Sequence, residues 1–240
     1  MYGFKKYREI DMSRNVTIIN YVVIGVLVIL NGFSCIYFFN ANNTESVFEN
    51  NIMKVVEIKT TNDENTWGYA TGFFINNNGT ILTNKHVVYN ASTNSNYDKI
   101  QVRSADMDEW VNAQIFKVSE TSDLAIIKIE KEKTPFFKIG KNIFNGQTIY
   151  TIGNPSGFGL SFTTGVVSSS EKNVIYNEQT IQTIQTSFVI NEGNSGGPVF
   201  DKYGNLLGVI SFRLRDNNGE VIQGVSFALP FSTINAFVQN

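Results

Sequence analysis

The chain contains one long apolar stretch and, after it, a series of short ones. Residues 16–39 (VTIINYVVIGVLVILNGFSCIYFF) carry no charged side chain, and the stretch is 39 − 16 + 1 = 24 residues long. As a helix it would extend about 36 Å, enough to cross a bilayer core of about 30 Å. The pattern therefore predicts a transmembrane helix over 16–39.

The charges on either side of this stretch predict its orientation. Lys5, Lys6, Arg8 and Arg14 precede it, whereas the first charged residue after it is Glu45. Because cytoplasmic flanks are enriched in Lys and Arg, residues 1–15 are expected to form a cytoplasmic tail and the rest of the chain to lie outside the cell membrane. An uncleaved, single-pass signal anchor explains the pattern best.

Two alternatives to the anchor stay open. Small residues at Gly32 and Ser34 would suit cleavage of a signal peptide before Cys35. Lipidation of Cys35 is the second alternative, although the segment before it lacks the aliphatic residue usual in a lipobox. The simplest interpretation of Cys35 is a small apolar residue within the membrane helix.

The rest of the chain has the pattern of an all-β domain. Residues 40–51 (NANNTESVFENN) are polar and predict a linker, and a short helix is expected at 231–238. Between them, turn signals separate about a dozen strand-like runs, which favours a sandwich or a pair of barrels, and 131–145 would suit the crossing between barrels. The predicted strands are 53–58, 72–75, 81–83, 99–103, 109–118, 124–129, 148–152, 162–167, 181–186, 198–200, 206–212 and 223–228.

Composition excludes several classes of function. Hydrophobic residues make up 42% and charged residues 17% of the 240 residues, so the chain has ample material for a core. A net charge of −2 argues against nucleic acid as a partner. With one Cys and one His, an intramolecular disulfide and a Cys-based or multi-His metal site are excluded. No metal or organic cofactor is expected, and any histidine chemistry must involve His86.

Three segments contain residues suited to nucleophilic catalysis: 81–88 (ILTNKHVV), 122–127 (SDLAII) and 192–198 (EGNSGGP). A serine hydroxyl needs a base, and the pKa of His suits that role near neutrality. A carboxylate fixes the imidazole tautomer, and glycines allow backbone N–H groups to converge on an oxyanion. The expected catalytic residues are His86, Asp123 and Ser195, with the N–H groups of Gly193 and Ser195 as the oxyanion hole.

Other carboxylates lie between the histidine and the serine. Asp98, Asp106 and Asp108 are in polar, loop-like surroundings, whereas Asp123 adjoins the apolar run LAIIKI. Desolvation there would strengthen the hold of the carboxylate on the imidazole. Asp123 is therefore the preferred candidate.

The motifs TNKHVV, SDLAIIKI and GNSGGPVF resemble the catalytic blocks of trypsin-like serine proteases with the chymotrypsin double-barrel fold. Further motifs are similar to the HtrA/Deg branch: GNPSG at 153–157, TGVVS at 164–168, IQT at 184–186 and GVSFALP at 224–230. The resemblance covers about 52–238. It implies a protease domain over 52–240 with two six-stranded antiparallel barrels, at about 52–130 and 146–230, and a short C-terminal helix.

The chain departs from the HtrA pattern at several points. Ser187 replaces the usual Asp after IQT, and Glu192 replaces the usual Pro before the glycine; both positions lie in the activation loop. Because the sequence ends at Asn240, no PDZ domain is expected after the protease domain. TNKHVV is also reminiscent of staphylococcal glutamyl endopeptidases, but these use a second histidine that this chain lacks.

The resemblance also implies a primary specificity pocket. Its floor lies six residues before the nucleophile, at Val189, and its walls would come from Ser211, Phe212, Arg213 and Gly224. An apolar floor favours small or medium apolar residues at the cleaved position and disfavours Lys and Arg. Substrate would pair with the 211–213 strand by β-addition.

The leading functional hypothesis is a membrane-anchored, extracytoplasmic serine endopeptidase that cleaves unfolded or exposed protein segments. One alternative is a proteolytically silent module that binds peptides as a chaperone, and another is a processing protease with one dedicated substrate. By family analogy the protein could form a homotrimer through N-terminal aromatic contacts, for which Phe48 is the candidate.

Overall fold

The computed structural model describes residues 22–32 and 43–239, apart from residues 64, 141, 177, 178 and 217. The chain divides into two units, Met1–Asn43 and Thr44–Asn240. Residues 22–32 are helical. Within the described ranges, no helix has both the length and the apolar character needed to cross a membrane. The predicted tail 1–15, Cys35 and the flanks 16–21 and 33–39 of the predicted membrane segment lie outside the described residues.

The strands in the first half of unit 2 form a seven-stranded sheet in the order β7-β6-β1-β2-β3-β9-β8. Its edge strands β7 and β8 are neighbours in the chain, separated only by Ala113, whose N–H donates to Ile100 O at 2.9 Å. The sheet therefore curls until its two edges meet. The strands are β1 (Val55–Thr61), β2 (Gly68–Phe74), β3 (Thr80–Thr83), β6 (Lys99–Ser104), β7 (Val111–Asn112), β8 (Gln114–Val118) and β9 (Ala125–Lys128).

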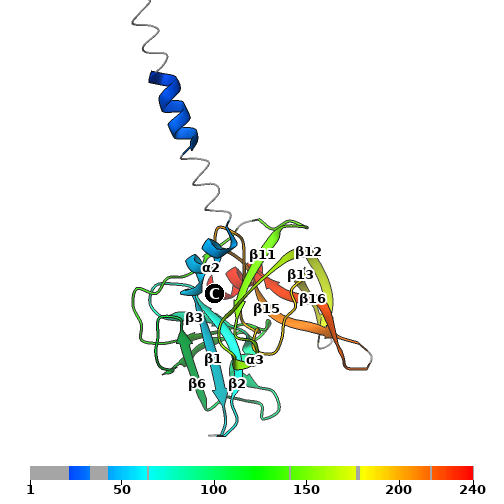
Figure 1. The fold of residues 1–240 in the computed structure, drawn as a ribbon. Coiled ribbons are helices and arrows are strands. Elements are labelled where there is room, and N and C mark those ends of the chain that lie inside the picture. Colours follow the sequence, from blue (N-terminus) through cyan, green and yellow to red (C-terminus); the bar gives the residue numbers. More distant parts are fainter. Residues whose placement is uncertain are drawn as a thin grey trace, which may run out of the picture. The chain divides into compact units, whose positions relative to one another are not determined.

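The second half of unit 2 forms another seven-stranded sheet, in the order β10-β15-β14-β11-β12-β13-β16, which closes on itself through pairing of β15 with β16. Figure 1 shows the two groups of strands as separate lobes of unit 2. The strands are β10 (Lys138–Ile139), β11 (Thr148–Gly153), β12 (Ser161–Tyr176), β13 (Gln179–Thr186), β14 (Pro198–Phe200), β15 (Asn205–Arg215) and β16 (Val221–Pro230).

The remaining elements are short. A small ladder joins β4 and β5, which lie in the chain between β3 and β6. The helix at the end of the chain begins at Phe231, as the sequence predicts, because its Ile234 and Phe237 can be buried together. These elements are β4 (Tyr89–Asn90), β5 (Ser95–Asn96), α2 (Thr44–Ile52), α3 (Lys85–Val88), the 3₁₀ helix η1 (Pro155–Gly157) and α4 (Phe231–Gln239).

One hydrophobic cluster connects the two sheets, and each sheet also encloses a cluster of its own. The shared cluster takes Phe73 from the first sheet and Phe200 from the second, with Phe137 between them at ring-centre distances of 5.6 and 5.1 Å. Phe137 lies in the stretch expected to cross between barrels. The shared core therefore holds the two lobes together at the level where their loops meet.

The structure corrects two expectations about the fold. Residues Thr44–Ile52 form α2 instead of a linker, because Val47 is buried and Phe48 packs edge-on against Phe162 at 5.6 Å. Phe48, the candidate trimer contact, thus packs within its own chain. Both barrels have seven strands instead of the expected six, because β7 and β8 are separate strands on either side of Ala113 and β10 joins the second sheet. The second barrel is also not purely antiparallel, because β10 pairs in parallel with β15.

Candidate active site

His86 and Asp123 are brought together by the first barrel. His86 lies on α3, directly after β3, and Asp123 lies just before β9, and these two strands are paired neighbours. The Asp123 carboxylate is 2.8 Å from His86 Nδ1 through Oδ2, and its Oδ1 accepts the His86 backbone N–H at 3.0 Å. Because a carboxylate accepts, Nδ1 carries the proton and Nε2 remains available as a base.

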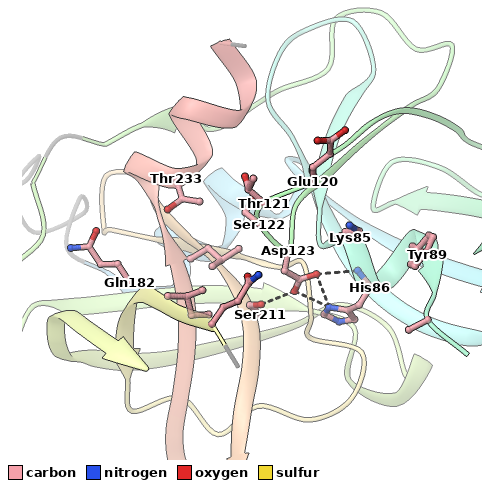
Figure 2. Close-up of a pocket in the computed structure, with 14 residues that line it drawn as sticks. Lys85, His86, Tyr89, Glu120, Thr121, Ser122, Asp123, Gln182, Ser211 and Thr233 are labelled. Atoms are coloured by element: carbon pink, nitrogen blue, oxygen red, sulfur yellow. Dashed lines mark hydrogen bonds and ion pairs between the residues drawn. The ribbon is translucent and has the colours of Figure 1, made fainter. Parts of the chain in front are cut away.

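Two further residues hold Asp123 in place. The Asn84 side chain donates to the Asp123 main-chain carbonyl at 2.8 Å, and the Ser211 hydroxyl donates to Asp123 Oδ2 at 2.7 Å. Figure 2 shows the Asp123 carboxylate between the His86 ring and Ser211. The hydroxyl of Ser211, expected in the substrate pocket, thus faces the carboxylate instead. The position of Asn84 in the motif TNKHVV, two residues before the histidine, is a signal from which its role could have been found.

Ser195 comes from the second barrel, on the loop between β13 and β14 (residues 187–197, here the nucleophile loop). Ser195, Gly193 and His86 line one cleft of about 470 Å³. Within the described residues, no hydrogen bond joins the side chains of Ser195 and His86. Such bonds are often long in the absence of substrate, so the shared cleft is the relevant observation.

The nucleophile loop is held by an unbroken set of hydrogen bonds, because every main-chain carbonyl from Ile190 to Ser195 accepts one. Sequence motifs did not indicate the distant donors Thr71, Ser156 and Arg213. The six bonds are Arg213 Nη1 to Ile190 at 3.0 Å, Asn194 N to Asn191 at 3.1 Å, Ser156 N to Glu192 at 2.7 Å, Thr71 Oγ1 to Gly193 at 2.6 Å, Gly197 N to Asn194 at 3.0 Å and Thr71 N to Ser195 at 2.9 Å.

These bonds determine the direction of the Gly193 N–H. In a trans peptide the N–H points opposite to the C=O, and the Glu192 carbonyl is bonded to Ser156 N. The Gly193 N–H therefore points away from Ser156, and within the described residues neither it nor the Ser195 N–H is bonded to an acceptor. Gly193 has φ of +97°, and a Cβ there would lie 2.1 Å from Asn154 O, so only glycine fits.

The residues expected to form the primary pocket lie around the nucleophile loop. Val189 is 54% exposed, while its neighbours Phe188 and Ile190 are buried. Arg213, with 18% of its side chain exposed, bonds to Ile190 O and lies 3.5 Å from the exposed Glu192 carboxylate. Phe212 stacks on Phe227 at 5.1 Å. The Arg213 guanidinium thus spans from β15 to the nucleophile loop.

Gly224 lies on β16 with φ of +72°. A side chain at this position would be strained by the left-handed backbone conformation. Gly224 therefore allows β16 to adopt a left-handed backbone conformation at this position. β16 pairs with β15, the strand that carries Arg213. Among the described residues, no cluster of three or more His, Cys, Asp or Glu is placed to hold a metal ion.

Comparison with known proteins gives one family. The trypsin-like peptidase domain matches residues 70–209. A protein of Pseudomonas fulva (strain 12-X), described as "Probable periplasmic serine endoprotease DegP-like", is 38% identical over 165 residues, which are 68% of this chain and 32% of that protein. A protein of Hahella chejuensis with the same description is 38% identical over 163 residues, 67% of this chain and 33% of that protein. The chain thus spans about a third of the length of these curated relatives.

Solved structures show the same likeness. The structure described as HtrA-type protease AlgW with tripeptide has a TM-score of 0.71 and 29% sequence identity, and the match covers 80% of this chain and 61% of that one. A serine-to-alanine variant of AlgW, also with tripeptide, has a TM-score of 0.70 and 28% identity over the same shares. The all-β, chymotrypsin-like architecture is common to these proteins and this chain.

Proposed function

Because this chain belongs to the trypsin-like peptidase family, we propose that it is a serine endopeptidase of the HtrA type. Ser195 is the nucleophile, His86 the general base and Asp123 the group that orients the base. The observation that supports this most is the 2.8 Å contact between Asp123 Oδ2 and His86 Nδ1, with Ser195 in the same cleft as the imidazole.

The chemistry follows from these positions. Ser195 Oγ attacks the substrate carbonyl carbon while His86 Nε2 takes the hydroxyl proton. The carbonyl oxygen becomes an oxyanion, which accepts hydrogen bonds from the N–H groups of Gly193 and Ser195. Collapse of the tetrahedral species breaks the C–N bond, and the leaving amine takes the proton from His86. In the second half of the reaction, water attacks the carbonyl carbon of the acyl-serine while His86 Nε2 takes a proton from the water. The bond to Ser195 Oγ then breaks, Oγ takes the proton back from His86, and the carboxylic acid is released.

A fluorophosphonate probe tests this proposal, because it labels only a serine activated by a base. The full chain should be labelled, and Ser195→Ala and His86→Ala should each abolish labelling and peptide cleavage with an unchanged circular dichroism spectrum. If the full chain is folded but is neither labelled nor able to cleave unfolded casein, the enzyme proposal is wrong and a silent binding module replaces it.

We further propose that substrates are unfolded or exposed protein segments with a small or medium apolar residue at the cleaved position. β14 pairs with β15 only as far as Val209, and we expect a substrate chain to add to β15 beyond this point, at 211–213. The Arg213 guanidinium bonds to the main-chain carbonyl of Ile190, the residue after Val189, and would restrict the size of the residue accepted there. A peptide library with a preference for Lys or Arg at the cleaved position would contradict this.

Finally, we propose that residues 16–39 anchor the protease in the membrane with unit 2 on the extracytoplasmic side. The uncharged run, the preceding basic residues and the word periplasmic in the descriptions of the relatives support this. Membranes washed with alkaline carbonate should retain the full chain and lose a variant that begins at residue 43. Release of the full chain by the same wash, or a mature protein that lacks residues 1–34 by mass, contradicts the anchor.

A further inference from the structure

The cleft beside Ser195 has an aromatic wall, and no residue of β15 lines this cleft. Three rings line it: Trp67, at the end of the loop between β1 and β2, Tyr69 at the start of β2, and Tyr97 between β5 and β6. Ser195 and Gly193 line the same cleft. A side chain of a bound peptide could therefore contact these rings while its scissile bond lies at the nucleophile.

The rings are held by the fold. Tyr69 packs on Gly157, where a Cβ would lie 2.8 Å from the ring. Lys59 Nζ lies 4.4 Å from the centre of the Trp67 ring, a cation–π contact that holds the indole against β1. The Tyr97 N–H donates to Val88 O at 3.0 Å, which anchors its segment to α3. A rigid wall loses little entropy when a ligand binds.

The direction of the substrate assigns this wall to the leaving-group side. The acyl side is expected along 211–213 of β15, and the cleft includes no residue of β15 or β16 in its lining. Its lining comes instead from the first barrel, η1 and the nucleophile loop. A chain that crosses Ser195 from β15 must therefore continue past Trp67 and Tyr69 after the scissile bond.

The charges around the wall disfavour charged side chains of either sign. Two cations already lie against Trp67, because the Nζ atoms of Lys59 and Lys99 are 4.4 and 5.7 Å from its ring centre, so an added cation would be repelled. Glu192, whose side chain is exposed, also lines the cleft, and its negative charge would repel an anion. Flat, neutral rings that stack or meet edge-to-face with Trp and Tyr match this environment.

We propose that Trp67, Tyr69 and Tyr97 form a subsite for an aromatic side chain on the leaving-group side of the cleaved bond. The inference rests on the proposed peptidase function. It adds a specificity for the residues after the cleaved bond to the specificity proposed for the residue before it. Substrates would then be recognised on both sides, and segments that expose Phe, Tyr or Trp, as unfolded proteins do, would be cleaved in preference.

The chain contains a matched control for this proposal. Trp110 also contacts Lys59, at 4.5 Å from its ring centre, but it does not line the cleft. Replacing either tryptophan removes one cation–π contact from the same lysine. Only the replacement of Trp67 removes part of the proposed subsite.

The experiment uses the full chain in detergent and a peptide series with a constant acyl side. Phe is placed at the first, second or third residue after the cleaved bond, with Gly, Lys and Asp at the same places for comparison. At one place, kcat/KM should be about tenfold higher for Phe than for Gly. Trp67→Ala should bring that ratio close to one, whereas Trp110→Ala should leave it unchanged.

Other outcomes overturn the proposal. Equal kcat/KM for Phe and Gly at all three places, a preference for Asp or Lys, or equal loss of the ratio in both tryptophan variants would each do so. If Trp67→Ala fails to fold, Tyr97→Ser provides a second test of the same ratio. Labelling of Ser195 by the fluorophosphonate separates the two levels: a labelled enzyme without aromatic preference contradicts this inference alone, and an unlabelled one contradicts the peptidase function as well.

Discussion

The Thr71 hydroxyl donates a 2.6 Å hydrogen bond to the main-chain carbonyl of Gly193, which links β2 of the first barrel to the nucleophile loop of the second. The same oxygen accepts the Asn154 N–H at 2.9 Å, and Thr71 O accepts from the Thr83 hydroxyl at 2.8 Å. Thr71 is fully buried. Thr71 thus connects the nucleophile loop and the Asn154 N–H through its side chain, and the strand that leads to His86 through its main-chain carbonyl.

Replacing this hydroxyl should impair catalysis more than substrate binding. Thr71→Val has nearly the same shape but leaves the Gly193 carbonyl and the Asn154 N–H without a partner, so the loop loses its orientation. We expect kcat to fall about tenfold to a hundredfold, no more than the loss of an oxyanion donor, with little change in KM. Thr71→Ser keeps the hydroxyl and should retain most of kcat. Equal kcat in both variants would contradict a positioning role.

Arg213 should limit the size of the residue accepted at the cleaved position. Its guanidinium bonds to Ile190 O at 3.0 Å, next to Val189, so Arg213→Ala should leave more room at the proposed primary pocket. The ratio of kcat/KM for Phe to that for Val at the cleaved position should rise about tenfold, measured with a peptide library. Glu192→Gln keeps the bond to Ile190 and should leave the ratio unchanged. A lower ratio in Arg213→Ala would show that the arginine supports the pocket instead of narrowing it.

Phe137 should contribute strongly to stability, because it packs between Phe73 and Phe200 where the two barrels meet. Phe137→Ala leaves a cavity in the shared core and should lower the free energy of unfolding by about 3–5 kcal/mol, measured by urea denaturation of a variant that begins at residue 43. The adjacent Phe136 is 37% exposed, and Phe136→Ala should cost well under half as much. Equal losses would mean that the crossing segment does not join the barrels.

Lys54 should make stability depend on pH in the alkaline range. Burial, together with the positive charge of Lys138, lowers the pKa of Lys54 below its usual 10.5. Between the lowered pKa and 10.5 the unfolded chain binds more protons than the folded one, so the Lys54 contribution to the free energy of unfolding rises with pH.

Comparison with a variant that cannot titrate isolates this effect. The free energy of unfolding of the parent chain should rise relative to Lys54→Met as the pH approaches 10.5 in urea denaturation. Lys138→Gln removes one cause of the shift and should reduce the slope. A difference that falls with pH would contradict the sign of the shift.

Much of the fold could be predicted from local pattern. β14 coincides with the run predicted at 198–200, and α4 ends within one residue of the predicted helix. Turn residues and short apolar runs are local signals, so they can be recognised without tertiary information. The resemblance to the HtrA/Deg branch is confirmed by the family match and the AlgW structures.

The elements that were missed depend on distant partners. α2 has too few apolar residues for its helix to be predicted locally, and it is stabilised because Val47 enters the shared core. The two residues of β10 form a strand only because β15 offers a parallel edge. In both cases tertiary packing overrides a weak local preference.

For the candidate site, short motifs were enough to identify which side chains are able to do the chemistry, because the reactivity of serine, histidine and aspartate belongs to the residue types themselves. The groups that hold these side chains could not be identified in the same way. The donor to Gly193 lies at Thr71, on the other barrel, and the partner of Asp123 lies at Ser211. These contacts arise only on folding, because a hydrogen bond depends on distance in space, and folding brings together residues that no local pattern relates.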